Sequence, residues 1–208
     1  MKKSLIELKD LARIARGDIL KMTTVADSGH PGGSMSSIDM YLSVLNRANL
    51  FPDNPYDPDR DRIIVSHGHT SPGYYVALAR MGFVNIEDVI TGFRHVGSVY
   101  EGHVTRGIPG VEWSTGNLGQ GLSAGVGMAL AAKLTNKNYK VYVFSSDGES
   151  AKGQIAEARR TARKENLNNL IVLLDYNDIQ ISGRARDILY VNIAAEYRAA
   201  GWNVIEID

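Results

Sequence analysis

Two polar residues that could bind a metal stand directly after apolar, β-branched runs. Asp147 follows "KVYVFSS" (140–146), and Asn177 follows "LIVLLDY" (170–176). Carboxylate and amide oxygens suit hard cations such as Mg²⁺, which keep several coordination positions for water and phosphate. The helix predicted just beyond Asp147 would offer its N-terminus to a phosphate. The pair therefore indicates a metal–diphosphate site.

Local structure alone also explains each of these motifs. Asp147 and Glu149 could cap a helix, and Asn177 with Asp178 could form a turn, because these residue types favour such positions. On this interpretation Glu149 is only a capping or solvent-facing carboxylate. Both explanations stay open for either motif taken by itself.

Three histidines stand in glycine-flanked loops of the first half of the chain. They are His30 in "SGHPGG", His69 in "SHGHTSPG" and His103 in "YEGHVTRG". Imidazole exchanges protons near pH 7 and can hydrogen-bond sugars or phosphates. A single loop histidine is more often a surface residue, but three in such loops favour a site. A zinc site is a rival, although no two histidines have the i, i+4 spacing of helical zinc ligands.

Alternating strands and helices must position these residues. Strands are expected over 62–66, 140–146, 170–176 and 202–207, and helices over 4–24, 40–45, 74–82, 154–167 and 192–201. Segment 27–34 is expected to be a loop, and 114–134 to open as a glycine loop and continue as a helix. This alternation predicts an α/β fold, a doubly wound, mostly parallel sheet with helices on both faces. Ligands of such sheets bind beyond the carboxyl ends of the strands, where Asp147, Asn177 and the "SHGH" loop fall.

Composition narrows the class of protein. The 208 residues have a formal net charge of +0, which gives no global reason to expect nucleic acid or an anionic membrane as partner. There is no cysteine, so disulfides and thiolate chemistry are excluded. Charged residues interrupt any N-terminal signal core or membrane span, so a cytoplasmic protein is expected. We expect one domain over residues 1–208, incomplete at its C-terminus because the last predicted element is a strand without a covering helix.

Five motifs follow one another from about residue 8 to the end. They are "SGHPGGS", "SHGH", "EGH" with "PGVEWSTGNLGQGLSAGVGMA", "SDGE", and "NLIVLLDYNDIQISG". In this order they resemble the N-terminal, diphosphate-binding domain of transketolase, a thiamine diphosphate enzyme. The most specific element is similar to the family's Gly-Asp-Gly signature with a later Asn, since Asn177 follows Asp147 by 30 residues.

The resemblance implies a cofactor site. Mg²⁺, or Ca²⁺ or Mn²⁺ in its place, would be bound by Asp147, Asn177 and the backbone carbonyl of Ile179. The diphosphate of thiamine diphosphate would be contacted by the Gly148 N–H and by His69, and the thiamine would be lined by Gly116 and Leu118.

The resemblance also implies a reaction and partners. His30 and His103 would hydrogen-bond the donor ketose, with His69 beside them, during transfer of a two-carbon ketol unit between sugar phosphates. The glutamate that activates the cofactor would come from a pyrimidine-binding domain or subunit outside this chain. The chain would then bind the cofactor weakly by itself, associate with copies of itself and that partner, and be active only in the assembly.

Three residues depart from the family pattern. Ser146 replaces the first glycine of the signature, Asn117 replaces a common proline, and Lys152 stands where a glutamate usually joins subunits. Two alternatives therefore stay open. One is another thiamine-dependent enzyme, such as a deoxyxylulose-phosphate synthase or a 2-oxo-acid dehydrogenase component. The other is a non-catalytic module that keeps the fold for assembly.

Overall fold

A computed structural model describes residues 2–207 and contains the predicted parallel sheet. Strands β1 (Arg62–Val65), β2 (Val141–Ser146) and β3 (Leu170–Asp175) pair in the order β1-β2-β3. Both pairings are parallel, with Val143 opposite Ile64 on one side and Val172 on the other. The carboxyl ends of all three strands therefore open at one edge of the sheet, as the sequence predicts.

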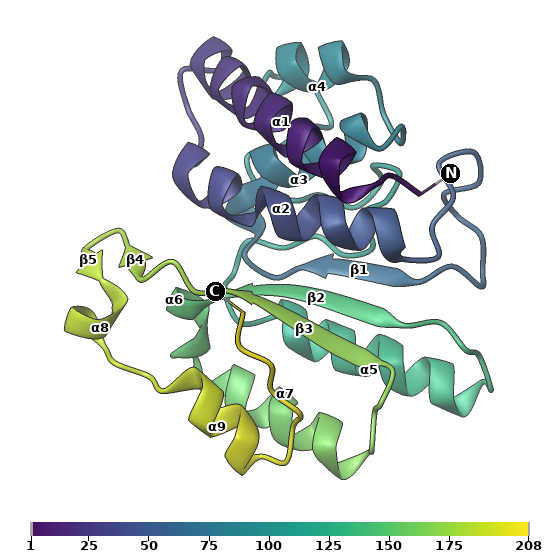
Figure 1. Cartoon of the computed structure of the whole chain (residues 1–208), viewed down its shortest axis with the longest axis vertical. Helices are drawn as coiled ribbons and strands as arrows, with labels where there is room; N and C mark the ends of the chain where they lie inside the picture. The colour runs from purple at the N-terminus through teal and green to yellow at the C-terminus, as the bar shows by residue number, and fades with distance from the viewer. Residues whose placement is uncertain (1, 208) are drawn as a thin grey trace.

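Helices cover both faces of this sheet (Figure 1). One face carries α1 (Leu5–Val25), α2 (Pro31–Arg47), α3 (Ser71–Arg80) and α4 (Ile86–Gly92); the other carries α5 (Gly121–Leu134), α7 (Gly153–Lys164) and α9 (Ile193–Ala199). Alternate residues of β1 enter separate cores, because strand side chains point to opposite faces. Ile63 and Val65 pack toward α1–α4, whereas Ile64 packs toward α5 and α7. The predicted α/β class is confirmed.

The first predicted helix, over 4–24, is present with almost the predicted bounds. Ser4 caps α1 and accepts a hydrogen bond from the Glu7 N–H, while the Glu7 carboxylate accepts one from the Ser4 N–H, which forms a capping box. Its apolar face is buried, including Ile19 and Met22. No helix within residues 2–207 combines the length and apolar character that crossing a membrane requires.

The second helix begins earlier than predicted. The sequence predicts a loop over 27–34, but α2 starts at Pro31. Proline suits the first helical position, where its missing N–H is not needed. Gly33 lets this end of α2 lie close to the 3₁₀ turn Gly68–Thr70, since a Cβ there would stand 3.2 Å from Thr70 Cγ2. Packing thus outweighs the poor helix propensity of glycine.

The strand predicted over 202–207 is wrong. Residues 203–207 make no backbone hydrogen bond within the described part of the chain, and the end of the trace is drawn as coil (Figure 1). Ile205 and Ile207 are 76% and 89% exposed, so the run buries no apolar face. The run stays unpaired although β3 is an edge strand in the order β1-β2-β3, so an apolar pattern by itself does not make a strand.

Short elements that the sequence did not reveal lie after β2 and β3. A four-residue helix, α6 (Asp147–Ser150), follows β2 directly. After β3 come the antiparallel strands β4 (Ile179–Gln180) and β5 (Gly183–Arg184), then α8 (Ala185–Ile188). Asp147 is the first residue of α6, Ile179 the first of β4, and Asn177 lies in the link between β3 and β4.

Candidate functional site

The two halves of the Asp–Asn motif are in direct contact. Asp147 Oδ2 accepts a hydrogen bond of 2.6 Å from the Asp178 N–H, and Oδ1 accepts one of 2.6 Å from the Gly148 N–H. Asn177 Oδ1 accepts from the Ile179 N–H at 3.0 Å. The carboxyl ends of β2 and β3 thus bring Asp147 against the backbone of segment 177–179, which carries the other two proposed metal ligands. Gly148 now uses its N–H internally, so a diphosphate would have to take that donor from Asp147.

The electrostatics of Asp147 favour a cation beside it. Burial raises the pKa of its carboxyl, the charges of Asp175 and Asp178 raise it further, and the two backbone hydrogen bonds lower it. Arg186 forms an ion pair with Asp178, and the hydrogen bond from its side chain lowers the pKa of the Asp178 carboxyl. A divalent cation would offset the remaining concentration of negative charge. The oxygen donors of Asp147 and Asn177 fit Mg²⁺.

A different kind of metal site has no support. Within residues 2–207 no group of three or more histidine, aspartate and glutamate side chains could hold a metal ion. This disfavours the zinc alternative, because zinc sites use such side chains. A metal bound at Asp147 would depend on amide and backbone oxygens.

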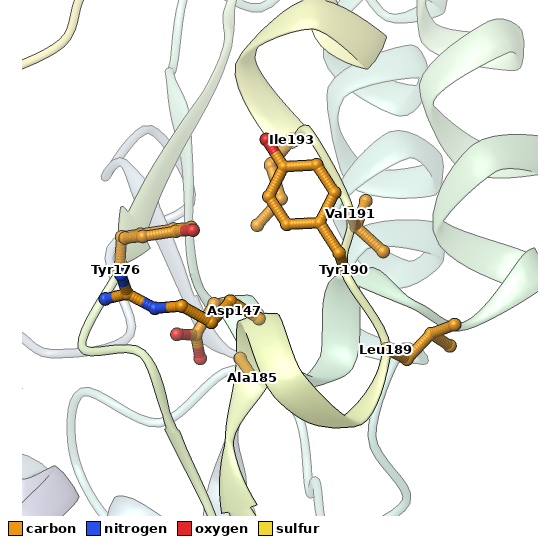
Figure 2. Close-up of a pocket in the computed structure, with 8 residues that line it drawn as sticks. Asp147, Tyr176, Ala185, Leu189, Tyr190, Val191 and Ile193 are labelled. Atoms are coloured by element: carbon orange, nitrogen blue, oxygen red, sulfur yellow. The ribbon is translucent and has the colours of Figure 1, made fainter.

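Asp147 also lines a small pocket beside the motif (Figure 2). Tyr176 lies on one side of this pocket, and Tyr190 lies on the other side together with Ile193 of α9. The two tyrosines are 55% and 64% exposed. An aromatic, accessible rim therefore adjoins the candidate metal ligand.

The three glycine-loop histidines lie close together. His30 precedes α2, and its ring centroid is 5.2 Å from that of His69, which lies in the Gly68–Thr70 turn. Burial lowers the pKa of His69 to about 4, and the charges of His30 and His103 lower it further. Burial is also the largest cause that lowers the pKa of His30, and the charges of Arg94 and His103 lower it further. His30 and His69 are therefore neutral near pH 7 and can both donate and accept hydrogen bonds.

The glycine loop of residues 114–120 packs against the carboxyl end of β1. Thr115 Oγ1 donates to the Val65 carbonyl at 2.7 Å, and the Thr115 N–H donates to the Val104 carbonyl at 2.9 Å. A Cβ on Gly116 would lie 3.4 Å from His103 Cδ2, so this loop and His103 adjoin. Gly116 is exposed and Leu118 half-buried, as lining residues of an open site would be.

Glu149 has a larger role than the sequence suggested. It forms the predicted cap, a capping box with Ser146, but it is completely buried, so the solvent-facing alternative is wrong. Its Oε2 accepts hydrogen bonds of 2.7 Å from Ser66 Oγ and from the Gly119 N–H. No local pattern could have shown this, because both partners are remote in the sequence.

A second network that the sequence did not reveal holds Asn177. Asn177 Nδ2 donates to Asp175 Oδ2 at 3.2 Å, and Ser37 Oγ donates to the same oxygen at 2.9 Å. Behind Ser37, His67 Nε2 lies 2.8 Å from Tyr41 Oη. His67 is buried beneath the site, unlike His69. The only signal in the sequence was a carboxylate at the last position of an apolar strand.

The structure also bears on two of the departures from the family pattern. Ser146 has φ −130° and ψ 163°, an extended conformation that any residue adopts, so serine is tolerated there. Lys152 is exposed, and its side chain lies against Gly119, where a Cβ would come within 2.9 Å of Lys152 Cβ. Lys152 therefore stands beside the glycine loop and faces solvent.

Comparisons with known proteins agree with this geometry. The profile of the family described as "Transketolase, thiamine diphosphate binding domain" matches residues 9–208. An apulose-4-phosphate transketolase subunit of Phocaeicola vulgatus is 36% identical over 195 residues, which are 93% of this chain and 69% of that protein. The 6-deoxy-6-sulfo-D-fructose transketolase subunit SqwG of Clostridium sp. is 36% identical over 211 residues, 100% of this chain and 76% of that protein.

Solved structures give the same result at the level of the fold. The transketolase of Campylobacter jejuni superposes with a TM-score of 0.89 at 31% identity, covering 96% of this chain. The chain spans about a third of that protein, 33% of its length. A profile that matches nearly the whole sequence, together with two subunits that are 36% identical and matched over 69% and 76% of their lengths, leaves one assignment. The chain belongs to the transketolase family and carries its thiamine diphosphate binding domain.

Proposed function

We propose that this chain binds the Mg²⁺–diphosphate end of thiamine diphosphate in a transketolase assembled from two kinds of chain. The observation that carries the proposal is the contact between Asp147 and the segment that begins at Asn177. It places a carboxylate and an amide oxygen at adjacent strand ends, where an α/β sheet binds its ligand. The cofactor supplies the nucleophilic carbon and the electron sink for the reaction.

Each proposed cofactor contact uses a group with suitable chemistry. Asp147, Asn177 and the carbonyl of Ile179 offer oxygen ligands to Mg²⁺, for which Ca²⁺ or Mn²⁺ could substitute. The Gly148 N–H and the neutral His69 ring offer donors to the diphosphate. The thiamine would be lined by Gly116 and Leu118 of the glycine loop.

His30 and His103 would bind the sugar. His30 Nδ1 is buried and has no hydrogen-bond partner within residues 2–207, so it has capacity for a ligand hydroxyl or carbonyl. The lowered pKa of His30 keeps its ring neutral near pH 7. A neutral ring orients a ketose by hydrogen bonds and can move a proton at its oxygen atoms. We propose ketose and aldose phosphates as the substrates.

A partner chain would complete the active site. Relatives that this chain matches over 69% and 76% of their lengths are named as subunits, whereas it covers 33% of the Campylobacter jejuni transketolase. We propose that the partner carries the pyrimidine-binding domain and the cofactor-activating glutamate, and that two such pairs associate. The exposed apolar side chains of Tyr176, Ile179, Ile181 and Tyr190 beside the metal ligands support a contact surface there.

Reconstitution tests this function. The purified chain alone is expected to show no ketol transfer, and addition of the pyrimidine-binding subunit is expected to produce transfer that depends on Mg²⁺ and thiamine diphosphate. Robust turnover by the chain alone would contradict the split arrangement. Binding of the partner without any cofactor binding would favour a non-catalytic assembly module instead.

A further inference from the structure

Glu149 is a buried carboxylate with four hydrogen bonds from three separate parts of the chain. Oε1 accepts from Ser145 Oγ at 2.7 Å and from the Ser146 N–H at 3.2 Å. Oε2 accepts from Ser66 Oγ and from the Gly119 N–H, each at 2.7 Å. The side chain is 0% exposed. No cation pairs with it among the ion pairs of residues 2–207, so its charge is stabilised by hydrogen bonds alone.

The three parts that it joins are those that would surround the cofactor. Ser66 directly follows β1 and leads into the turn with His69. Ser146 directly precedes Asp147. Gly119 follows Leu118 in the glycine loop, and the next glycine, Gly121, donates its N–H to Ser66 Oγ at 3.2 Å.

Stability of the fold alone does not call for a charge at this position. Burying a carboxylate costs several kcal/mol before its hydrogen bonds are counted, and apolar residues often replace buried charges without loss of stability. An apolar side chain would pack there but could not fix the distance between the glycine loop and the end of β2. Two backbone donors on one rigid carboxylate do fix it.

We propose that Glu149 is the positioning residue of the cofactor site, which holds the glycine loop in place relative to Asp147 and Gly148. This inference rests on the proposed function, since it assumes that those two segments share one ligand. Glu149 itself is too enclosed to contact the cofactor. It acts through Gly119 and Ser146.

The hydrogen-bond pattern makes glutamine a sharp test. Each carboxylate oxygen accepts one backbone N–H, from Gly119 at Oε2 and from Ser146 at Oε1. Glutamine has one oxygen and one NH₂ group, so in either orientation the NH₂ faces a backbone N–H. One of the two segments must move, although size and shape are almost unchanged.

Glu7→Gln is the matched control. Glu7 also closes a capping box, with Ser4 at the start of α1, but it is exposed and lies outside the site. Ser66→Ala is the second variant. It removes the hydroxyl that links Glu149 to the Gly121 N–H and leaves the end of β2 intact.

The experiment measures two properties of the full chain well below its melting temperature. Calorimetric titration with thiamine diphosphate in Mg²⁺ gives affinity, and amide hydrogen exchange reports on Gly119 and Gly121. Glu149→Gln is expected to weaken binding tenfold or more and to speed exchange of the glycine loop, and Glu7→Gln to change neither. Ser66→Ala should weaken binding less, and the double variant should lose less than the sum, because both act on one link.

The outcomes separate the two levels of the proposal. If the wild-type chain binds and a folded Glu149→Gln binds within twofold of it, the positioning role is wrong while the proposed function stands. If Glu149→Gln does not fold, unchanged affinity of Ser66→Ala contradicts the role in the same way. If the wild-type chain binds no cofactor, both alone and with its pyrimidine-binding partner, the proposed function fails and the inference with it.

Discussion

The backbone N–H of Asp178 donates a 2.6 Å hydrogen bond to the carboxylate of Asp147, which joins the ends of two neighbouring strands. These residues are remote in sequence, and the parallel pairing of β2 with β3 brings them together. The contact places Asn177 beside Asp147 at the edge of the sheet where ligands bind. The proposed function depends on this relationship.

Removing the charge of Asp147 should separate metal binding from stability. Asp147→Asn keeps the shape, and the raised pKa of Asp147 shows that the surroundings disfavour its charge. Asparagine has one oxygen and one NH₂ group, so its NH₂ must face the N–H of either Gly148 or Asp178; the melting temperature without ligand should therefore fall modestly, while stabilisation by Mg²⁺ with thiamine diphosphate should disappear. Asp187→Asn, an exposed carboxylate of α8, is the control and should bind like the wild type. Retained Mg²⁺-dependent stabilisation in Asp147→Asn would show that the metal ligand is assigned wrongly.

Asp175 is expected to raise the affinity for the metal, although it does not contact the metal in the proposed site. Asp175→Ala leaves the Asn177 amide without its acceptor, so its orientation is lost, at a cost of about 1–3 kcal/mol in stability. Affinity for Mg²⁺ with thiamine diphosphate should fall about tenfold, measured by calorimetry. Ser36→Ala is the control, because Ser36 donates to the other carboxylate oxygen at 2.8 Å and leaves the bond to Asn177. Equal effects of the two substitutions would count against a specific role for Asp175.

Buried histidines should make stability fall in acid. Burial lowers the pKa of His67 to about 3, and an exposed histidine titrates near 6.5, so between these values the unfolded chain binds more protons. The contribution of His67 to the free energy of unfolding is therefore fully present above about pH 6.5. It declines toward pH 3, by up to about 1.4 kcal/mol per pH unit. Urea unfolding at a series of pH values from 7.5 to 4.5 measures this decline in the free energy of unfolding.

The same pH series on two variants identifies the histidine. His67→Gln should be less stable at neutral pH but show a shallower decline in acid, whereas His95→Gln, at an exposed position, should keep the wild-type slope. An unchanged slope in His67→Gln would assign the acid sensitivity to other groups.

We expect that position 68 must be glycine, because the glycine loop of residues 114–120 lies very close to Gly68. A Cβ there would lie 2.3 Å from Thr115 Oγ1 and 2.8 Å from the Thr115 backbone carbon. Gly68→Ala should destabilise the chain by about 1–3 kcal/mol through overpacking and should weaken cofactor binding. Gly127→Ala in α5 meets no atom within 4 Å and should stabilise the chain by up to about 1 kcal/mol. Chemical unfolding measures both, and a neutral Gly68→Ala would show that the loop does not need this contact.

The sequence predicts what depends on local patterns. Apolar runs followed by polar residues located β1, β2 and β3, and the 30-residue spacing from Asp147 to Asn177 located the candidate metal ligands. Glu149 illustrates the limit, because its partners Gly119 and Ser66 lie 30 and 83 residues away and only the fold brings them to one carboxylate. The failed strand at 202–207 has the same origin, since pairing depends on a neighbour and not on the run itself.

The most direct test of the central claim is calorimetric titration of the purified chain with thiamine diphosphate, in Mg²⁺ and again in excess chelator. The account predicts binding of one cofactor per chain that requires the metal, that is lost in Asp147→Asn, and that adds about 2.7 kcal/mol of stability at a hundredfold excess over Kd. Absence of binding by the chain, both alone and with its pyrimidine-binding partner, would contradict it, and so would binding that survives both the chelator and Asp147→Asn.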